Sequence, residues 1–305
     1  MIDNNFLQEL IKRPQQIVNL KFEDISKILS KAKDIFKEEN LLLEFNIDDR
    51  EENVYVIGDI HGNLDSLLTL IDIMKKSNPK LIIFLGDIVD RGIRQLECLI
   101  VILAFKILNP NRVFLLKGNH ETLEMNQYYG FFQEFIQRFN DQNKFKEILE
   151  IYYILPFCAT INSKTLCLHG GIPEDIEILK KLKGLKPQDI HSVFKSISDG
   201  LYQIIWNDPK EGLKGFVDSF RGPGIKFFGE DVFNSFMEAN NLKYLIRAHE
   251  CFPEGYRWFF NNHLLSIFSS ANYRGFYAPN PASYAIVRND KILPINVEIS
   301  KTVLD

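Results

Sequence analysis

Side chains able to bind metal ions occur in five short groups along the chain. The groups are residues 58–63, 86–92, 118–121, 169–171 and 247–250, and each directly follows an apolar run typical of a β-strand. Four of the six histidines lie in these groups, which random placement would rarely give. Because α/β sheets build their ligand sites beyond the carboxyl ends of strands, we expect the five groups to meet.

The carboxylate, imidazole and amide side chains of these groups suit a centre of two metal ions. Asp59 and His61 are two residues apart, so at an extended strand end they face the same side and can bind one ion. Asp87 follows the next strand, and its two carboxylate oxygens can bridge two ions. The predicted metal ligands are Asp59, His61, Asp87, Asn119, His169 and His249.

A catalytic pair is expected beside the ligands. Adjacent residues of an extended chain point to opposite sides, so Asn119 and His120 should not both bind metal. We assign Asn119 to the metal and leave His120 facing the substrate. Asp90, three residues after Asp87, is expected to orient His120 and raise its basicity.

The charge of such a centre suits phosphate ester hydrolysis. Two divalent ions with Asp59, Asp87 and a bridging hydroxide leave a charge of about +1, which attracts a phosphate dianion and still produces a nucleophile near neutral pH. Arg91 and Arg221 can add the bidentate donors that phosphate oxygens favour. Two simpler interpretations remain open, since Arg91 could form a structural ion pair and Arg221 lies in an Arg-Gly-Pro-Gly segment typical of a plain turn. Tyr273, in a loop after a strand, is either partly buried or lines the cleft.

Alternating strands and helices are expected to position these groups. A β-α-β-α-β unit with right-handed crossovers is predicted for residues 54–117, with strands at 54–58, 81–86 and 112–117 and helices at 64–76 and 94–108. Helices are predicted at 121–140 and 145–153. Further strands are predicted at 165–168, 244–246, 264–268, 283–287 and 292–299, the last three antiparallel in a second sheet.

The chain reads as one catalytic domain over residues 1–305. A helical segment at about 6–45, with apolar residues at helical spacing, is expected to pack on it. We find no repeat, low-complexity segment or linker, and residues 207–224 read as one long loop.

Composition excludes several classes of protein. A net charge of −4 argues against a nucleic-acid binder. The longest apolar run, residues 98–105, is too short to cross a bilayer, and charged residues soon interrupt the first apolar stretch. The four cysteines are widely spaced, which favours buried thiols in a reducing compartment. We therefore expect a cytoplasmic protein without membrane or nucleic-acid partners.

With all five groups in place, the chain resembles the phosphoprotein phosphatase family, to which protein phosphatases 1 and 2A and calcineurin belong. The resemblance runs from about residue 17 to about residue 290. It implies a mixed α/β, calcineurin-like metallophosphoesterase fold, a two-sheet β-sandwich flanked by helices. It also implies that Asp59, His61 and Asp87 hold one ion and that Asp87, Asn119, His169 and His249 hold the other.

The resemblance implies roles for the remaining residues as well. His120 resembles the general acid that protonates the leaving alkoxide, with Asp90 orienting it. Arg91 and Arg221 resemble the phosphate clamps, assisted in substrate binding by Asn119, and Tyr273 resembles the cleft tyrosine.

Four departures from the family pattern stand out. Lys117 replaces an arginine before Gly-Asn-His-Glu, which puts a bidentate support role in doubt. Ser270-Ala271 replaces Ala-Pro, and Arg274 replaces a small or thiol residue, adding a cation near the cleft. The spacing from Arg221 to Phe228 is one residue longer.

The leading hypothesis is a protein serine/threonine phosphatase that attacks phosphoserine and phosphothreonine with a hydroxide bound at two divalent ions. Mixed nitrogen and oxygen ligands suit manganese, iron or zinc. The expected partners are phosphoprotein substrates and regulatory subunits. The alternatives are a hydrolase of small phosphoesters such as dinucleoside polyphosphates and an inactive phosphate-binding scaffold.

Overall fold

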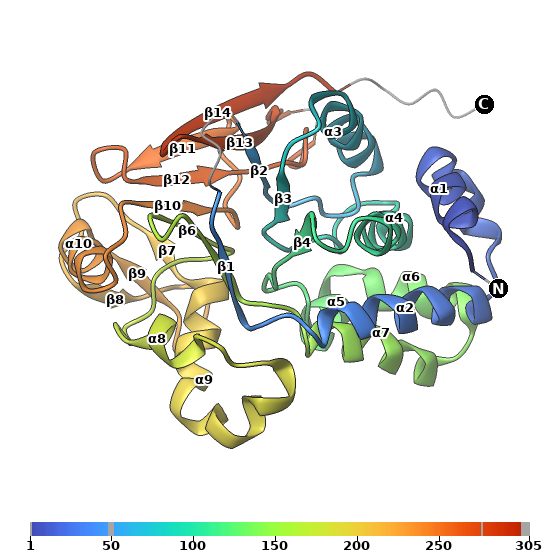
Figure 1. Ribbon diagram of the computed structural model, residues 1–305, viewed down its shortest axis with the longest axis horizontal. Helices are drawn as coiled ribbons and strands as arrows, with labels where there is room; N and C mark the ends of the chain where they lie inside the picture. Colours follow the sequence, from blue (N-terminus) through green and yellow to red (C-terminus); the bar gives the residue numbers. More distant parts are fainter. Residues whose placement is uncertain (1, 48–51, 276, 300–305) are drawn as a thin grey trace.

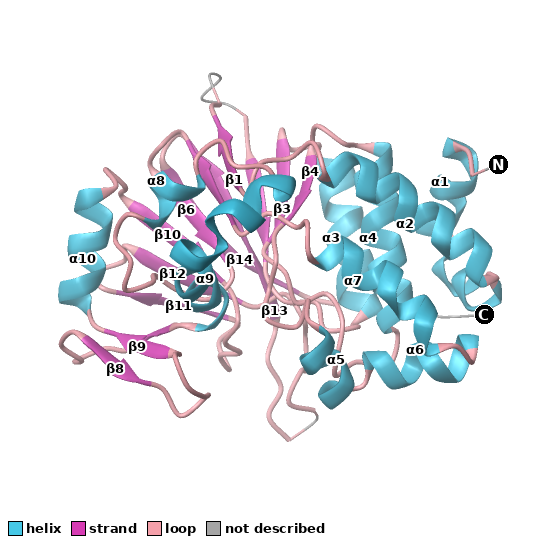
Figure 2. Ribbon diagram, turned by 90° about the horizontal axis from the view of Figure 1, so that it is seen from below, coloured by secondary structure: helices cyan, strands magenta, loops and turns pink. Residues whose placement is uncertain are grey.

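The computed structural model describes residues 2–47, 52–275 and 277–299. Two large sheets pack face to face, with most helices against one side and three helices against the other (Figures 1 and 2). No helix in the described ranges is both long and apolar enough to cross a membrane. The predicted mixed α/β sandwich flanked by helices is confirmed.

Sheet A has the strand order β1-β5-β6-β10-β12-β11 and sheet B the order β14-β13-β2-β3-β4. The strands of sheet A are β1 (Leu42–Phe45), β5 (Cys158–Ile161), β6 (Thr165–Leu168), β10 (Tyr244–Arg247), β11 (Tyr256–Phe259) and β12 (Leu264–Ile267). The strands of sheet B are β2 (Val54–Ile57), β3 (Leu81–Phe84), β4 (Val113–Leu115), β13 (Ala282–Arg288) and β14 (Lys291–Val297). A small third sheet contains β7 (Asp208–Pro209), β9 (Lys226–Phe228) and β8 (Phe216–Asp218).

The helices form two groups. One side of the sandwich carries α1 (Asn4–Lys12), α2 (Phe22–Phe36), α3 (Leu64–Ser77), α4 (Gln95–Leu108), α5 (Leu123–Tyr129), α6 (Phe131–Phe139) and α7 (Lys146–Tyr152). The other side carries α8 (Ile178–Leu182), α9 (Ile190–Trp206) and α10 (Glu230–Ala239). Short 3₁₀ turns lie at Pro14–Asn19, Gln142–Phe145 and Pro187–Asp189.

Three apolar layers hold these elements together. Between the sheets, residues such as Ile83 and Leu85 of the β3 segment pack with Leu265 and Ile267 of β12. The outer face of sheet B packs on the helices of the first group, and the outer face of sheet A packs on α8, α9 and α10. Strands β2 and β3 are buried on both faces, which explains their continuous apolar sequences.

The predicted parallel unit is confirmed, because β2 pairs with β3 and β3 with β4, all parallel, with α3 and α4 as the crossovers. The four described cysteines are buried and free, as expected.

Several expectations about the later strands were wrong. Strands β13 and β14 are antiparallel but belong to sheet B, where β13 pairs with β2. Strand β12 lies in sheet A, parallel to β10 and antiparallel to β11. Chain order cannot reveal that β12 and β13 lie in different sheets, since this choice depends on which apolar face is still uncovered.

Other boundaries also need correction. The helix predicted at 121–140 is divided at Gly130, whose φ of 116° ends α5 and begins α6. The helical segment predicted to reach residue 45 ends with α2, and residues 42–45 form β1, which pairs with β5. The loop predicted at 207–224 contains β7 and β8.

Helix α4 lies between sheet B and the other helices, so its residues 95–106 are all buried and most of them are apolar. Lys106 is fully buried there, donates to a Glu39 carboxylate oxygen and also donates to the carbonyl of Pro110 at 2.8 Å. Burial raises the pKa of Glu39 and lowers that of Lys106, and in both cases it outweighs the attraction between them. The pair therefore adds little net stability, but either partner alone would be a poorly compensated buried group.

We predict that Glu39→Gln lowers the free energy of unfolding by about 3 kcal/mol, because Lys106 loses its buried counterion. Adding Lys106→Met to that variant should recover most of the loss. The matched control is Glu44→Gln, which removes the partner of exposed Lys183 and should cost under about 1 kcal/mol. Denaturant unfolding measures the free energy of unfolding of all three variants. Equal losses of stability for Glu39→Gln and Glu44→Gln would contradict the prediction.

Candidate metal centre

The five groups predicted from sequence meet at one edge of the sandwich. Asp59 and His61 follow β2, Asp87 follows β3, and Asn119 and His120 follow β4, all from sheet B. His169 and His249 follow β6 and β10 of sheet A. All of these strands are parallel neighbours within their own sheets, so their carboxyl ends share one edge.

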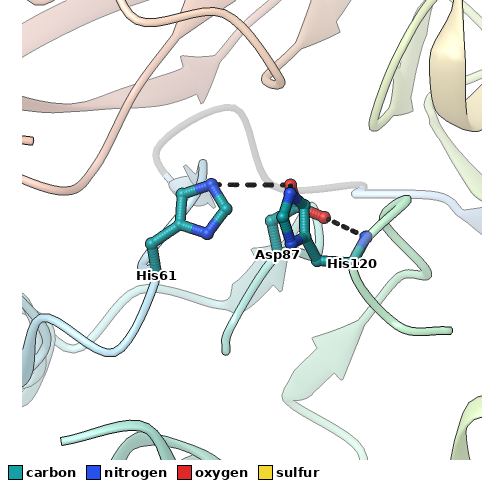
Figure 3. Close-up of side chains that lie close together, drawn as sticks. All are labelled: His61, Asp87 and His120. Atoms are coloured by element: carbon teal, nitrogen blue, oxygen red, sulfur yellow. Dashed lines mark hydrogen bonds and ion pairs between the residues drawn. The ribbon is translucent and has the colours of Figure 1, made fainter. Parts of the chain in front are cut away.

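Asp87 is the common element of the centre. Its Oδ2 atom lies 3.6 Å from Nε2 of His61, 3.9 Å from Nε2 of His120 and 3.3 Å from Nε2 of His169. Its Oδ1 atom accepts the backbone N–H of His120 at 2.9 Å, as Figure 3 shows together with the contact to His61. Asp87 is 1% exposed, so one buried carboxylate oxygen faces three imidazoles.

Two clusters of side chains meet at this oxygen. One contains His61, Asp87 and His120, and the other contains Asp87, His169 and His249. Asp59 belongs beside the first cluster, since its Oδ2 lies 3.4 Å from Nε2 of His61.

The second cluster also includes the predicted amide ligand. Nε2 of His169 lies 2.9 Å from Oδ1 of Asn119 and 3.1 Å from Nδ1 of His249. Burial and the nearby positive charge of Arg221 hold the pKa of His249 well below its usual range, so this imidazole is neutral and able to bind a metal.

The tautomers of two histidines fit a cation. Nδ1 of His61 contacts the carbonyl of Val89 at 3.0 Å, and Nδ1 of His169 contacts that of Leu85 at 3.1 Å. A carbonyl only accepts, so in the neutral rings Nδ1 carries the proton and Nε2 presents a lone pair toward Asp87.

Lone pairs and carboxylates facing one another require positive charge between them. Oδ2 of Asp59 is buried with no hydrogen-bond partner. Burial opposes protonation of His61, yet the Asp59 and Asp87 carboxylates raise the pKa of His61 to about 9. These residues therefore fit two divalent cations that share Asp87.

The local backbone differs from the extended conformation assumed from sequence. His61, Asp87, Asp90, Arg91 and His249 have φ values of 47°, 53°, 67°, 74° and 70°, in the left-handed region. Each costs roughly 1–2 kcal/mol for a residue with a Cβ, and such strain is concentrated at functional sites. The extended conformation predicted for His61 is therefore wrong, although its ring does face Asp59 as expected.

The same correction applies to Asn119 and His120, which lie in a turn. Both side chains are buried and both face the centre, rather than pointing to opposite sides. They are separated by position instead, because Asn119 contacts His169 whereas His120 lies beside His61 and Asp90.

The buried carboxylate of Glu121 has a positioning role that the sequence did not reveal. It accepts the backbone N–H groups of Asp87, Ile88 and Gly118 at 2.8, 3.0 and 2.8 Å. These bonds tie the segment after β3 to the segment after β4. A Cβ at Gly118 would lie 2.2 Å from Oδ1 of Asp87, so only glycine allows this approach. The Glu after Asn-His was visible in the sequence, but nothing there indicated which backbone N–H groups donate to it.

His120 is held by a buried hydrogen-bond network. Its Nδ1 lies 2.7 Å from Oδ2 of Asp90, which also accepts from the Asn126 side chain at 2.8 Å. Oδ1 of Asp90 accepts the first N–H of α6, from Phe131, at 3.0 Å. The network leaves Nε2 of His120 facing the centre.

Arg91 and Tyr273 lie at the open side of the centre. The Arg91 guanidinium is stacked 3.7 Å over the ring of Tyr129, and the side chain is exposed. The Tyr273 ring stacks on His61 with centroids 4.9 Å apart, and burial raises its pKa. His61, Arg91 and Tyr273 line a common cavity of 470 Å³.

Arg221 is held by an ion-pair network rather than by a plain turn. Its Nε donates to Oδ2 of Asp208 at 2.5 Å, and the other oxygen of Asp208 accepts from Arg247 at 2.7 Å. Arg247 is fully buried and donates to the carbonyl of Gly170, next to His169. The network therefore joins Arg221 to the second cluster.

Two departures from the family pattern have structural explanations. Lys117 is buried and donates to the carbonyl of Tyr152 at 2.7 Å, so it joins the end of β4 to α7. Burial lowers its pKa to about 8. Arg274 is exposed and donates to the carbonyl of Cys251 at 3.1 Å.

Comparison with known proteins gives two kinds of similarity. The family model described as calcineurin-like phosphoesterase matches residues 52–253, more than half of the chain. A solved protein serine/threonine phosphatase from Saccharomyces cerevisiae, with similarity to human phosphatase PP5, is 25% identical. The match covers 99% of this chain and 98% of that one, with a TM-score of 0.81.

A more distant solved structure is the cold-active protein-tyrosine phosphatase of the psychrophile Shewanella sp. It is 18% identical with a TM-score of 0.60, and the match covers 86% of this chain and 81% of that one. At this identity the similarity shows a common fold.

We predict that the metal-free protein binds Mn²⁺ more tightly as pH rises from about 6.5 to about 8.5. The carboxylates keep a proton on His61 below its pKa of about 9, and this proton must leave before Nε2 can bind a metal. Each displaced proton gives up to about a tenfold gain in affinity per pH unit. Calorimetric titrations in two buffers of different ionisation enthalpy would detect the released protons, and an affinity independent of pH would contradict the prediction.

Proposed function

Because the chain belongs to the calcineurin-like phosphoesterase family, we propose that it is a protein serine/threonine phosphatase. The observation that carries this substrate class is the similarity to the Saccharomyces cerevisiae phosphatase along nearly the whole of both chains. The family membership itself supports phosphoester hydrolysis, with residues able to bind divalent metals at the expected place.

The proposed metal ligands divide between the two clusters around Asp87. One ion would be held by Asp59, His61 and Asp87, and the other by Asp87, Asn119, His169 and His249. Bound there, the ions would offset the charge of the phosphate and lower the pKa of a water molecule enough to make it a nucleophile. Manganese, iron and zinc all suit this mixture of nitrogen and oxygen donors.

His120 is the proposed general acid rather than a ligand, although it lies close enough to Asp87 to be counted with the first cluster. Its Nδ1 is already bonded to Asp90, so Nε2 is the atom that passes a proton to the leaving alkoxide of serine or threonine. Asp90 acts as a positioning residue, because its contacts with Asn126 and Phe131 keep the imidazole in one orientation.

Arg91 and Arg221 are the proposed phosphate clamps. The Arg91 guanidinium stacks on the ring of Tyr129, and Asp208 accepts a hydrogen bond from Nε of Arg221. Both arginines are thus oriented before the substrate arrives, which reduces the entropy lost on binding. In the same proposal, Asn119 and Tyr273 line the phosphate site.

The surroundings of the centre favour a polypeptide substrate. Ile93 and Phe220 lie within two residues of the two arginines and are each 89% exposed, and Tyr128, next to Tyr129, is 78% exposed. Sites for small molecules usually bury most of the ligand, whereas an open centre surrounded by exposed apolar side chains suits a protein surface. Two alternatives remain, a hydrolase of small phosphoesters and an inactive phosphate-binding scaffold.

We also propose a cytoplasmic location, phosphoprotein substrates and regulatory subunits as partners. The four buried free thiols support a reducing compartment.

We predict that the Mn²⁺-loaded enzyme has a kcat/KM on phosphoserine or phosphothreonine peptides at least about a hundredfold higher than on diadenosine tetraphosphate. The reason is that Ile93 and Phe220 can contact residues flanking the phosphorylated side chain. Initial rates on a panel that includes phosphotyrosine peptides and p-nitrophenyl phosphate test this. A preference for the nucleotide supports the small-phosphoester alternative, and no turnover of any phosphoester supports the scaffold.

We predict that His120→Asn lowers kcat by about 10²- to 10⁴-fold while metal content stays unchanged, since the proton donor is lost but no ligand is. The loss should be smaller for p-nitrophenyl phosphate, whose leaving group needs less protonation. The matched control is His191→Asn at an exposed position, which should keep full activity. If His120→Asn loses metal in proportion to activity, His120 is a ligand instead.

A further inference from the structure

Two adjoining cavities lie at the other end of strands β2, β3 and β4 from the metal centre. One cavity, of 380 Å³, is lined by residues just before these strands, including Asn53, Lys80 and Arg112. The other, of 370 Å³, lies between α1, α3 and α4. Asn78 and Arg112 line both cavities, so the two spaces meet at these side chains.

Arg112 is a partly exposed cation that lines both cavities. Its Nε atom is buried and has no hydrogen-bond partner, and no described carboxylate forms an ion pair with its guanidinium. Burial lowers the pKa of Arg112, as expected where no negative charge compensates the cation. Because Arg112 as a whole is partly exposed, an acceptor in the cavities would be bound by the terminal N–H groups of its guanidinium.

The local charge favours an anion. Among the residues that the structure describes, the 370 Å³ cavity is lined by the cations Lys75 and Arg112 and by no carboxylate. In the other cavity, Glu52 is already paired with Lys80 at 2.9 Å. Helices α3 and α4 end here, and their two carboxyl-terminal dipoles amount to about −1 charge against the two cations. The balance is therefore positive.

The carbonyls at these helix ends are also occupied by other donors. The N–H of Asn78 bonds to the carbonyl of Met74 at 2.9 Å, and the side chain of Asn109 bonds to that of Phe105 at 3.0 Å. Arg112 is therefore not a cap for either helix.

The 370 Å³ cavity combines this positive charge with an apolar wall and several amides. The apolar lining is Ile11, Met74, Phe105 and Leu108, and the amide side chains are Asn4, Gln8, Asn78 and Asn109. Such a surface can contact a ring or short apolar chain on one side and polar substituents on the other.

We propose that these joined cavities form a second ligand site, separate from the metal centre, for a small organic anion. Its phosphate-like oxyanion is bound by the planar fork of Arg112, with Lys75 adding charge. Its apolar portion lies against Met74 and Phe105. Helix α4 extends from this site to Gln95, whose side chain accepts the backbone N–H of Asp90 beside the metal centre. The ligand therefore contacts a helix that also positions part of the metal centre.

Phenylphosphonate is a suitable probe, because its phosphorus–carbon bond is not an ester and a phosphoesterase leaves it intact. In calorimetric titrations of the metal-loaded protein, the wild type should bind one equivalent more than Arg112→Gln, or bind that equivalent about 10- to 100-fold more tightly. Inorganic phosphate should bind the Arg112-dependent site at least about tenfold more weakly, since it cannot contact the apolar wall.

The matched control is Lys76→Gln, which removes a cation from the same helix end but lines neither cavity. It should bind like the wild type, and activity on p-nitrophenyl phosphate should be unchanged in both variants. Should Arg112→Gln not fold, Lys75→Gln at an exposed position is expected to weaken binding severalfold. The proposal is overturned if folded Arg112→Gln binds phenylphosphonate like the wild type, or if Lys76→Gln loses as much affinity for phenylphosphonate as Arg112→Gln. It is also overturned if inorganic phosphate binds the Arg112-dependent site as tightly as phenylphosphonate.

Discussion

The arrangement of the metal centre depends on one buried carboxylate oxygen, Oδ2 of Asp87. It lies within 4 Å of imidazole nitrogens from three different segments, and the carboxylate of Asp59 lies just beyond one of them. Although burial raises it, these imidazoles lower the pKa of Asp87. Although burial opposes it, the carboxylates raise the pKa of His61 and of His169, so without cations protons on these two imidazoles balance the charge. The group therefore fits a centre of divalent ions.

Both sheets of the sandwich are needed to bring these charged side chains together. Sheet B supplies Asp59, Asp87 and Asn119, and sheet A supplies His169 and His249, so neither sheet alone contains the whole set. The apolar layer between the sheets fixes the distance between their carboxyl edges. Glu121 and the Arg247–Asp208 pair then hold the segments beyond the strands by hydrogen bonds to the backbone and to charged groups.

The reactive edge and the opposite edge of sheet B differ in how their charges are compensated. At the reactive edge, the polar side chains are paired with one another within the centre, and Oδ2 of Asp59, buried without a hydrogen-bond partner, faces Nε2 of His61. At the opposite edge, Arg112 has no acidic partner among the described residues, and the cavities around it remain open to a ligand.

Much of the candidate site could be predicted from sequence, because each polar group follows an apolar run and parallel strands bring their carboxyl ends to one edge. The positions of Asp59, Asp87 and His169 depend only on this rule. Which way a side chain faces beyond a strand depends on the backbone of that turn. The left-handed conformations of His61 and Asp87 are imposed by contacts with Glu121 and neighbouring segments, far away in sequence.

The amino-acid sequence by itself therefore determined the kinds of ligand, their order and the parallel unit that carries them, since these follow from local periodicity and strand ends. Only the tertiary structure decided that β13 joins β2, that Asp208 and Arg247 hold Arg221 beside the second cluster, and that Arg112 lies between two cavities with no acidic partner among the described residues. Those outcomes depend on packing and charge compensation between distant segments, which no local pattern records.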